Sequence, residues 1–245
     1  EFADYFWPAV EQYVECTHEY WRSNGKFVPN IVLRLASGGY IGGGLYHSQN
    51  IEGALATLPG ARIVCPSFAD DAAGLLRTAM RSRGFTLYLE PKALYNSVEA
   101  SSVVPEEFEV PFGKARIRRE GTDLSMITYG NTTHFCLNVA ERLAQEGWSV
   151  EVIDLRSLIP LDKETIYASV KKTSKALVVH EDKVFSGFGA EIAAGIGTEL
   201  FRYLDAPVQR VGSVFTPVGF HPILEKAILP TEDKIYDAAR TLLEY

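Results

Sequence analysis

Apolar residues occur along this chain in short runs that alternate with amphipathic stretches. Short apolar runs bounded by glycine, proline or polar residues indicate strands, while apolar positions three and four residues apart indicate helices. We therefore expect strands at 27–36, 62–66, 85–89, 113–119, 123–130, 149–155, 176–181 and 208–211. The expected helices cover 8–20, 48–58, 67–81, 133–146, 162–171, 187–202 and 233–245. Strands that alternate with helices in this order predict right-handed crossovers and mostly parallel sheets.

One segment interrupts the alternation. Residues 96–110 are rich in Ser, Val, Glu and Pro and follow neither the helical nor the strand period, which is typical of an exposed linker. The sequence therefore predicts an α/β protein with two parallel-sheet domains, at 1–98 and 113–245, joined by a linker at 99–112.

Capping signals mark several of the expected helix ends. Ser67 is placed to cap the helix that follows it, and two aspartates in the first turn complement the helix dipole. Asp162 is a second N-cap, and Ser48 or Asn50 is a candidate for a third. Gly147 is expected to end its helix in a left-handed conformation.

The most unusual stretch follows the first apolar strand. Five of the seven residues in 38–44 are glycine, so this stretch suits neither a helix nor a strand interior. A buried strand that ends in a glycine-rich loop can bring the backbone close to a ligand. The loop then presents His47, Ser48 and Gln49 in succession. We interpret it as an active-site loop, and the alternative is a surface loop with a chance histidine.

Composition narrows the function classes. Hydrophobic residues make up 47% of the 245 residues, which predicts a packed core. The net charge of −7 argues against nucleic-acid binding. No apolar run reaches the ~18 residues that a membrane-spanning helix needs. The three cysteines lack metal-ligand spacing, and their odd number favours a reducing, intracellular setting.

At this point a resemblance becomes evident. The chain resembles, over residues 1–245, the beta subunit of the thiamine-diphosphate-dependent decarboxylating component of 2-oxo acid dehydrogenase complexes. The matching motifs are Phe2–Tyr5, Gly42–Gln49, Glu90–Lys92, Val152–Arg156, His180–Glu181 and Gly187–Ile192. The second and third motifs look more like the branched-chain 2-oxoisovalerate enzyme than the pyruvate enzyme, which stays as the alternative. The resemblance implies a transketolase-type pyrimidine-binding domain, here truncated, followed by a transketolase C-terminal-like domain.

The resemblance also implies roles for individual residues. His47 matches the histidine at the active-site channel, where it would protonate a dithiolane sulfur or hold a reaction intermediate. Tyr5 matches the aromatic residue that stacks on the aminopyrimidine ring of the cofactor. Tyr46 would line the substrate pocket or simply pack, and Ser48 and Gln49 would hold the loop by hydrogen bonds.

The implied activity is oxidative decarboxylation of a 2-oxo acid with acyl transfer to lipoyl groups, as in branched-chain amino acid catabolism in a bacterial cytoplasm. The intact enzyme would use thiamine diphosphate with magnesium. Its partners would be an alpha subunit or a fused alpha half, a second copy of this chain and a lipoyl-bearing acyltransferase core.

The chain lacks an initiator methionine, and the glutamate that activates the cofactor would lie upstream of Glu1. We therefore expect a piece of a longer polypeptide that binds little cofactor and is inactive alone. A non-catalytic dimerisation or docking module is the alternative. Transketolase and deoxyxylulose-phosphate synthase are a runner-up family, but the glycine loop shows none of the basic residues that their sugar phosphates need.

Members of this family often bind a potassium ion just before the strand that begins at Phe85. The side-chain ligands expected there correspond to Ser82 and Gly84, and the neighbouring Arg81 and Arg83 are basic. Hard cations prefer carboxylate and amide oxygens. We therefore predict that the potassium site is weak or absent and assign no metal ligands here, and we expect bland structural roles for His134 and His221.

Overall fold

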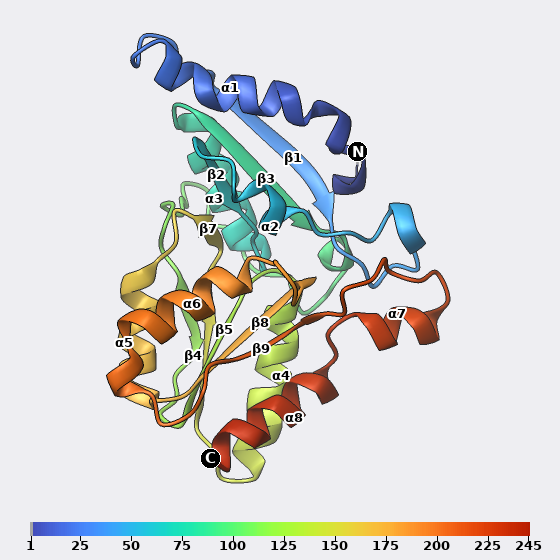
Figure 1. Ribbon diagram of the computed structural model, residues 1–245, viewed down its shortest axis with the longest axis vertical. Coiled ribbons are helices and arrows are strands. Elements are labelled where there is room, and N and C mark those ends of the chain that lie inside the picture. The colour runs from blue at the N-terminus through green and yellow to red at the C-terminus, as the bar shows by residue number, and fades with distance from the viewer. Residues whose placement is uncertain (1) are drawn as a thin grey trace.

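The computed structural model describes residues 2–245, which form two α/β sheets with helices packed around them (Figure 1). The first sheet has the strand order β1 (Ile31–Ser37), β3 (Phe85–Pro91), β2 (Ala61–Val64) and β7 (Ser157–Ile159). The second has the order β4 (Arg116–Arg119), β6 (Val150–Asp154), β5 (Leu124–Thr128), β8 (Ala176–Lys183) and β9 (Gln209–Ser213). Neighbouring strands are parallel except for β7 against β2 and β4 against β6. The predicted fold class is confirmed.

Helices surround both sheets. They are α1 (Val10–Arg22), α2 (Glu52–Leu55), α3 (Ala69–Arg81), α4 (Thr132–Gln145), α5 (Lys163–Thr173), α6 (Gly189–Glu199), α7 (Pro222–Ile228) and α8 (Glu232–Leu243). Short 3-10 turns occur at η1 (Ala3–Tyr5), η2 (Trp7–Ala9), η3 (Gly44–Tyr46), η4 (Lys92–Leu94) and η5 (Phe201–Tyr203).

The central strands of the second sheet are buried on both faces, as expected for parallel strands between helices. Met126 and Val152 pack with α4 and α8 on one face. Ile127, Ile153 and Val178 belong to a core cluster that includes α5 and α6 and continues into the first sheet. One apolar cluster therefore spans the two sheets, while the α4 and α8 face of the second sheet has a cluster of its own.

A buried ion-pair network also joins the two sheets. Asp71, in the first turn of α3, accepts hydrogen bonds from Arg118 and from Arg156, the latter at 2.7 Å. Arg118 also donates to Asp154 at 2.7 Å, and Asp71 and Asp154 are fully buried. Beyond complementing a helix dipole, Asp71 therefore ties the start of α3 to the second sheet.

One strand, β7, and one α-helix, α7, were not predicted from the sequence. β7 lies between the expected strand and helix of the second half, yet it pairs with β2 of the first sheet. Its three residues carry no local strand signal, so only long-range pairing defines it. α7 begins at Pro222, and the ring of His221 caps it by accepting the Ile223 N–H at 3.3 Å. The helix expected at 48–58 shrinks to the four residues of α2.

The cap predictions were partly right. Asp162 accepts the Thr165 N–H at 3.1 Å and caps α5, and Gly147 follows α4 with φ +93°. The prediction for Ser67 is wrong, because Phe68 occupies the N-cap of α3 and the Ser67 hydroxyl donates instead to Asp154 at 2.9 Å. Neither Ser48 nor Asn50 caps α2, whose N-cap is Ile51 without a side-chain bond.

The middle of the predicted linker is exposed, but its ends are anchored. Ala100 and Val110 are buried, while residues 101–107 lie on the surface. Arg77 of α3 donates to the carbonyls of Pro105 and Phe108 at 2.9 and 3.0 Å. The segment therefore follows α3 closely.

Candidate active site

The glycine loop begins where β1 ends, and it has little room for side chains at Gly38, Gly39 and Gly43. Gly38 has φ +85°, and a Cβ there would lie 2.5 Å from the Glu181 carboxylate. At Gly43, a Cβ would lie 2.7 Å from the His47 Cβ. The glycines therefore allow the loop to pack tightly against both its own histidine and the second sheet.

The loop brings His47 beside two aromatic rings from the start of the chain. The His47 ring lies edge-on to Tyr5, with centroids 5.6 Å apart and planes at 75°. It lies closer to Phe2, at 4.7 Å and 77°. Asp4, between these aromatics, accepts the backbone N–H of Gln49 at 3.0 Å. Tyr5 is 49% exposed, so one side of this cluster remains accessible.

The other predicted site residues differ in their surroundings. Tyr46 is 69% exposed, and its hydroxyl makes no hydrogen bond within residues 2–245. Ser48 is buried, and its hydroxyl also lacks a partner in the described part of the chain. Gln49 bridges the loop, because its amide nitrogen donates to the Leu45 carbonyl at 3.1 Å and its oxygen accepts from Lys183 at 2.9 Å.

The second half of the chain holds the glycine loop at its start and at its end. At the start, the Glu181 carboxylate accepts the Gly39 N–H. At the end, Lys183 binds the Gln49 side chain. Both contacts come from the last residues of β8. His180–Glu181 is one of the motifs that carry the family resemblance, but the motif does not predict that this end of β8 anchors the glycine loop.

A second set of contacts comes from the segment around α7. Glu225 accepts the Gly42 N–H at 3.3 Å, and the Tyr40 hydroxyl donates to the Pro230 carbonyl at 2.8 Å. Figure 1 shows this red segment beside the blue glycine loop. We call the contacts of the glycine loop with β8 and α7 the loop anchor.

Two carboxylates in this region, Glu181 of the loop anchor and Glu52, are buried. Burial raises the pKa of Glu181 to about 7, although the Gly39 N–H and the charge of Lys92 act in the opposite direction. Burial, together with the charge of Asp182, raises the pKa of Glu52 to about 8, and Glu52 accepts the Tyr129 hydroxyl at 3.0 Å. These groups therefore hold protons at a higher pH than ordinary carboxylates do.

His180 lies in this interior without being a catalytic candidate. Burial lowers its pKa to about 4, and neither ring nitrogen has a hydrogen-bond partner within residues 2–245. A Cβ on Gly189, at the start of α6, would lie 2.2 Å from the His180 ring. The geometry supports the predicted close packing of a glycine helix against this strand.

The segment before Phe85, where the potassium site is predicted to be weak or absent, makes its own polar contacts. Gly84 donates its N–H to the Asn30 side chain at 2.9 Å, and Arg62 donates to the Arg83 carbonyl at 2.7 Å. A guanidinium therefore binds a backbone oxygen at this position. Within residues 2–245, no group of three or more His, Cys, Asp or Glu side chains is arranged to hold a metal ion.

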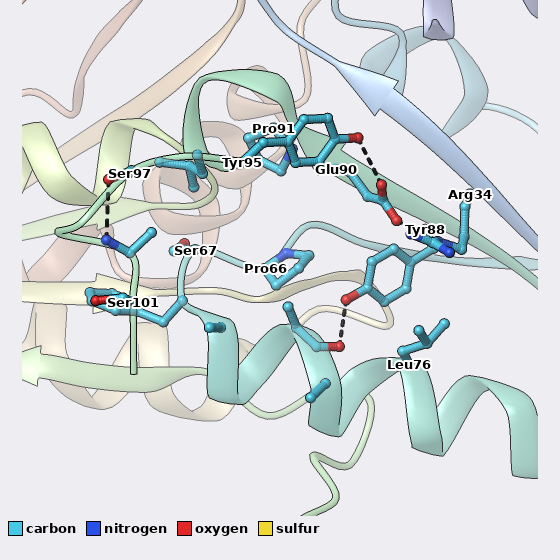
Figure 2. Close-up of a pocket in the computed structure, with 16 residues that line it drawn as sticks. Arg34, Pro66, Ser67, Leu76, Tyr88, Glu90, Pro91, Tyr95, Ser97 and Ser101 are labelled. Carbon is cyan, nitrogen blue, oxygen red and sulfur yellow. Dashed lines mark hydrogen bonds and ion pairs between the residues drawn. The ribbon is translucent and has the colours of Figure 1, made fainter. Parts of the chain in front are cut away.

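A separate cavity of about 420 Å3 opens in the first domain (Figure 2). It lies between α3, the end of β3 and residues 94–101. None of the predicted site residues lines it. Sequence reasoning missed it because its lining comes from segments scattered between Arg34 and Ser101.

No helix within residues 2–245 combines the length and apolar character that crossing a bilayer requires.

Comparison with known families defines the class of protein. Residues 1–98 match the family of the transketolase pyrimidine binding domain, and residues 113–235 match the transketolase C-terminal domain. A solved structure described as a split gene transketolase, inactive beta4 tetramer, superposes with a TM-score of 0.69 at 23% identity. That superposition covers 89% of this chain and 67% of the other, and it supports the fold alone.

Closer relatives define the family. The chain is 40% identical over 247 residues to the 2-oxoisovalerate dehydrogenase subunit beta of Bacillus subtilis (strain 168), covering 100% of this chain and 75% of the relative. It is 39% identical over 225 residues to the pyruvate dehydrogenase E1 component subunit beta of the same organism, covering 92% and 69%. The chain belongs to the family of 2-oxo acid dehydrogenase beta subunits, which confirms the resemblance predicted from its motifs.

Proposed function

We propose that this chain supplies the His47 side of a thiamine diphosphate site in a 2-oxo acid dehydrogenase of the branched-chain 2-oxoisovalerate type. The observation that carries the proposal is the cluster of His47 with Tyr5 and Phe2 on an accessible edge of the first domain. An imidazole beside a half-exposed phenol ring suits a site that must bind a flat heterocycle and move a proton.

The residues present fit the pyrimidine end of the cofactor. Tyr5 offers a partly exposed ring for stacking, and Asp4 links it to the loop through the Gln49 N–H. When bound, thiamine diphosphate supplies the nucleophile and the electron sink for decarboxylation. His47 would hold or donate a proton beside it.

Gln49 holds the loop that carries His47 by hydrogen bonds, whereas the Ser48 hydroxyl has no partner within residues 2–245 and Ser48 contributes by packing. Tyr46 lies on the exposed side of the loop, toward substrate. The buried Ser48 packs beside Gly43. A Cβ added at Gly43 would lie 3.0 Å from the Ser48 hydroxyl. Gln49 binds Lys183. The loop anchor therefore restricts the position of the imidazole, which is what proton transfer at a defined atom requires.

The remaining parts of the proposal concern partners. An alpha subunit or alpha half would hold the diphosphate and magnesium, and a lipoyl-bearing acyltransferase core would accept the acyl group. The 245-residue chain alone would bind little cofactor. The domains would divide at 1–98, 99–112 and 113–245.

An assembly role for the second half has its own support. The ring centroids of Phe185 and Phe215 lie 4.6 Å apart with the planes tilted at 49°, and the two residues are 65% and 68% exposed. Phe220, nearby in sequence, is 75% exposed. Exposed aromatic clusters are typical of protein contact surfaces. A second copy of the chain is the partner that we propose for this surface, and this role coexists with catalysis in the assembled enzyme.

The proposal is tested with the chain assembled with its alpha partner. We expect kcat/KM with a lipoyl domain as acceptor to be higher for 2-oxoisovalerate than for pyruvate. His47→Gln should lower kcat at least ~100-fold, as expected when a general acid is lost. His221→Asn is the matched control, because asparagine can still cap α7. Equal loss of activity in both variants, or full activity of His47→Gln, would refute the assignment.

A further inference from the structure

The cavity in the first domain has an apolar interior. Its floor is formed by small residues of α3, Ala69, Ala72 and Ala73, which leave space where larger side chains would fill it. Leu76 and Leu94 add apolar surface to its lining. Figure 2 shows α3 along one side of the cavity and the Tyr95 ring across from it. Such a volume is in the range of small-molecule sites, which is roughly 300–1,000 Å3.

One end of the cavity carries an ion pair. The Arg34 Nε donates to Glu90 at 2.5 Å, and the other oxygen of Glu90 accepts the Tyr95 hydroxyl at 2.8 Å. The Glu90 carboxylate therefore has a donor on each oxygen. The two terminal amino groups of Arg34 make no hydrogen bond to any residue in 2–245, and its side chain is 59% exposed.

Three side-chain hydroxyls that line the cavity already donate hydrogen bonds to other groups of the chain. The Tyr88 hydroxyl donates to the Ala72 carbonyl at 2.6 Å. The Ser101 hydroxyl donates to the Val98 carbonyl at 2.6 Å, and the Ser97 hydroxyl donates to Glu99 at 2.8 Å. The guanidinium of Arg34 thus supplies the hydrogen-bond donors that remain free for a ligand, and it lies at the mouth.

We propose that this cavity binds a small carboxylic acid with an apolar tail. The carboxylate would pair with Arg34 at the mouth, where guanidinium and carboxylate geometry match. The tail would lie over the alanines of α3, because a polar tail would lose its hydration without gaining partners there. This site is independent of the function proposed for His47.

The experiment measures binding of octanoate and of its neutral analogue octanamide to the 245-residue chain by isothermal titration calorimetry. We expect saturable octanoate binding, with octanamide about two- to fivefold weaker, as for loss of one solvent-exposed ion pair. Arg34→Gln should weaken octanoate to the level of the amide. Arg81→Gln is the matched control, because Arg81 is 62% exposed and also pairs with a glutamate, Glu109, outside the cavity.

A second variant tests the apolar part separately. Ala72→Leu should fill the floor and abolish binding of both compounds, while circular dichroism confirms that the variant is folded. Equal affinity for acid and amide would overturn the role of Arg34. Unchanged binding in a folded Ala72→Leu variant, or no saturable binding to the wild-type chain, would overturn the site itself.

Discussion

The contact between the glycine loop and the second sheet can be tested by Gly38→Ala. Two effects oppose the new methyl group. The backbone at Gly38 has φ +85°, which costs an ordinary residue ~1–2 kcal/mol. The added Cβ would also lie 2.5 Å from a carboxylate oxygen of Glu181, which is itself buried and bound to Gly39.

The magnitude follows from these two effects. Overpacking in a closely packed region typically costs ~1–3 kcal/mol. Together with the backbone strain, Gly38→Ala should therefore lower the free energy of unfolding by ~3 kcal/mol. Gly42→Ala separates the effects, because Gly42 has φ +65° but no atom within 4 Å of its Cβ position. That variant should lose only ~1 kcal/mol.

The assay is urea unfolding of both variants and the wild-type chain, followed by circular dichroism at constant pH. The midpoint should fall clearly further for Gly38→Ala than for Gly42→Ala, with similar slopes. Equal losses for the two variants would mean that Glu181 does not pack against the start of the loop, and the loop anchor would then be wrong.

Three further predictions concern the ion pairs, the pH dependence and the metal. Asp71→Ala should destabilise the chain by ~3 kcal/mol in the same urea assay, because it leaves the charge of Arg118 less fully matched in the interior. The folded-state pKa values of Glu181 and Glu52, about 7 and about 8, exceed the ordinary value of 4.5. The folded chain then binds more protons than the unfolded chain between pH ~4.5 and 8, so stability should fall as pH rises through that window. Changing both residues to Gln should flatten this fall in melting temperatures measured at pH 5 to 8. Exchanging potassium for sodium should leave the melting temperature unchanged, because Arg62 already binds a backbone oxygen at that position.

Much of the fold could be predicted from local patterns. The central strands are rich in apolar residues, as in the run Ala176–Val179 of β8, and they are buried on both faces as such runs predict. Asp162 and Gly147 mark helix ends, and each does so through a hydrogen bond to a residue three positions away, Thr165 or Ala144. Local interactions of this kind are readable from sequence.

The failures share a long-range cause. The hydroxyl of Ser67 binds Asp154, which lies 87 residues further along the chain, instead of capping its own helix. β7 is a strand because β2 lies beside it, and its own sequence carries no such signal.

For the candidate site, as for the fold, the local features could be predicted from the sequence and the long-range contacts could not. The glycine pattern indicated a ligand-binding loop, and the family resemblance implied that His47 and Tyr5 share one site, which remains a prediction. The loop anchor was not predictable. Glu181 and Lys183 reach the loop from residues more than 130 positions away, and nothing in their local sequence specifies that contact.

The central claim is that the aromatic edge beside His47 forms part of a thiamine diphosphate site. The most direct measurement is the affinity of thiamine diphosphate with magnesium for the chain assembled with its alpha partner, determined by calorimetry for the wild type and for Tyr5→Ser. Tyr20→Ser is the matched control, because Tyr20 on α1 is 47% exposed against 49% for Tyr5. We predict about tenfold weaker binding for Tyr5→Ser alone, in line with ~1–2 kcal/mol for a lost ring contact. Unchanged affinity in Tyr5→Ser, or an equal loss in both variants, would contradict the account.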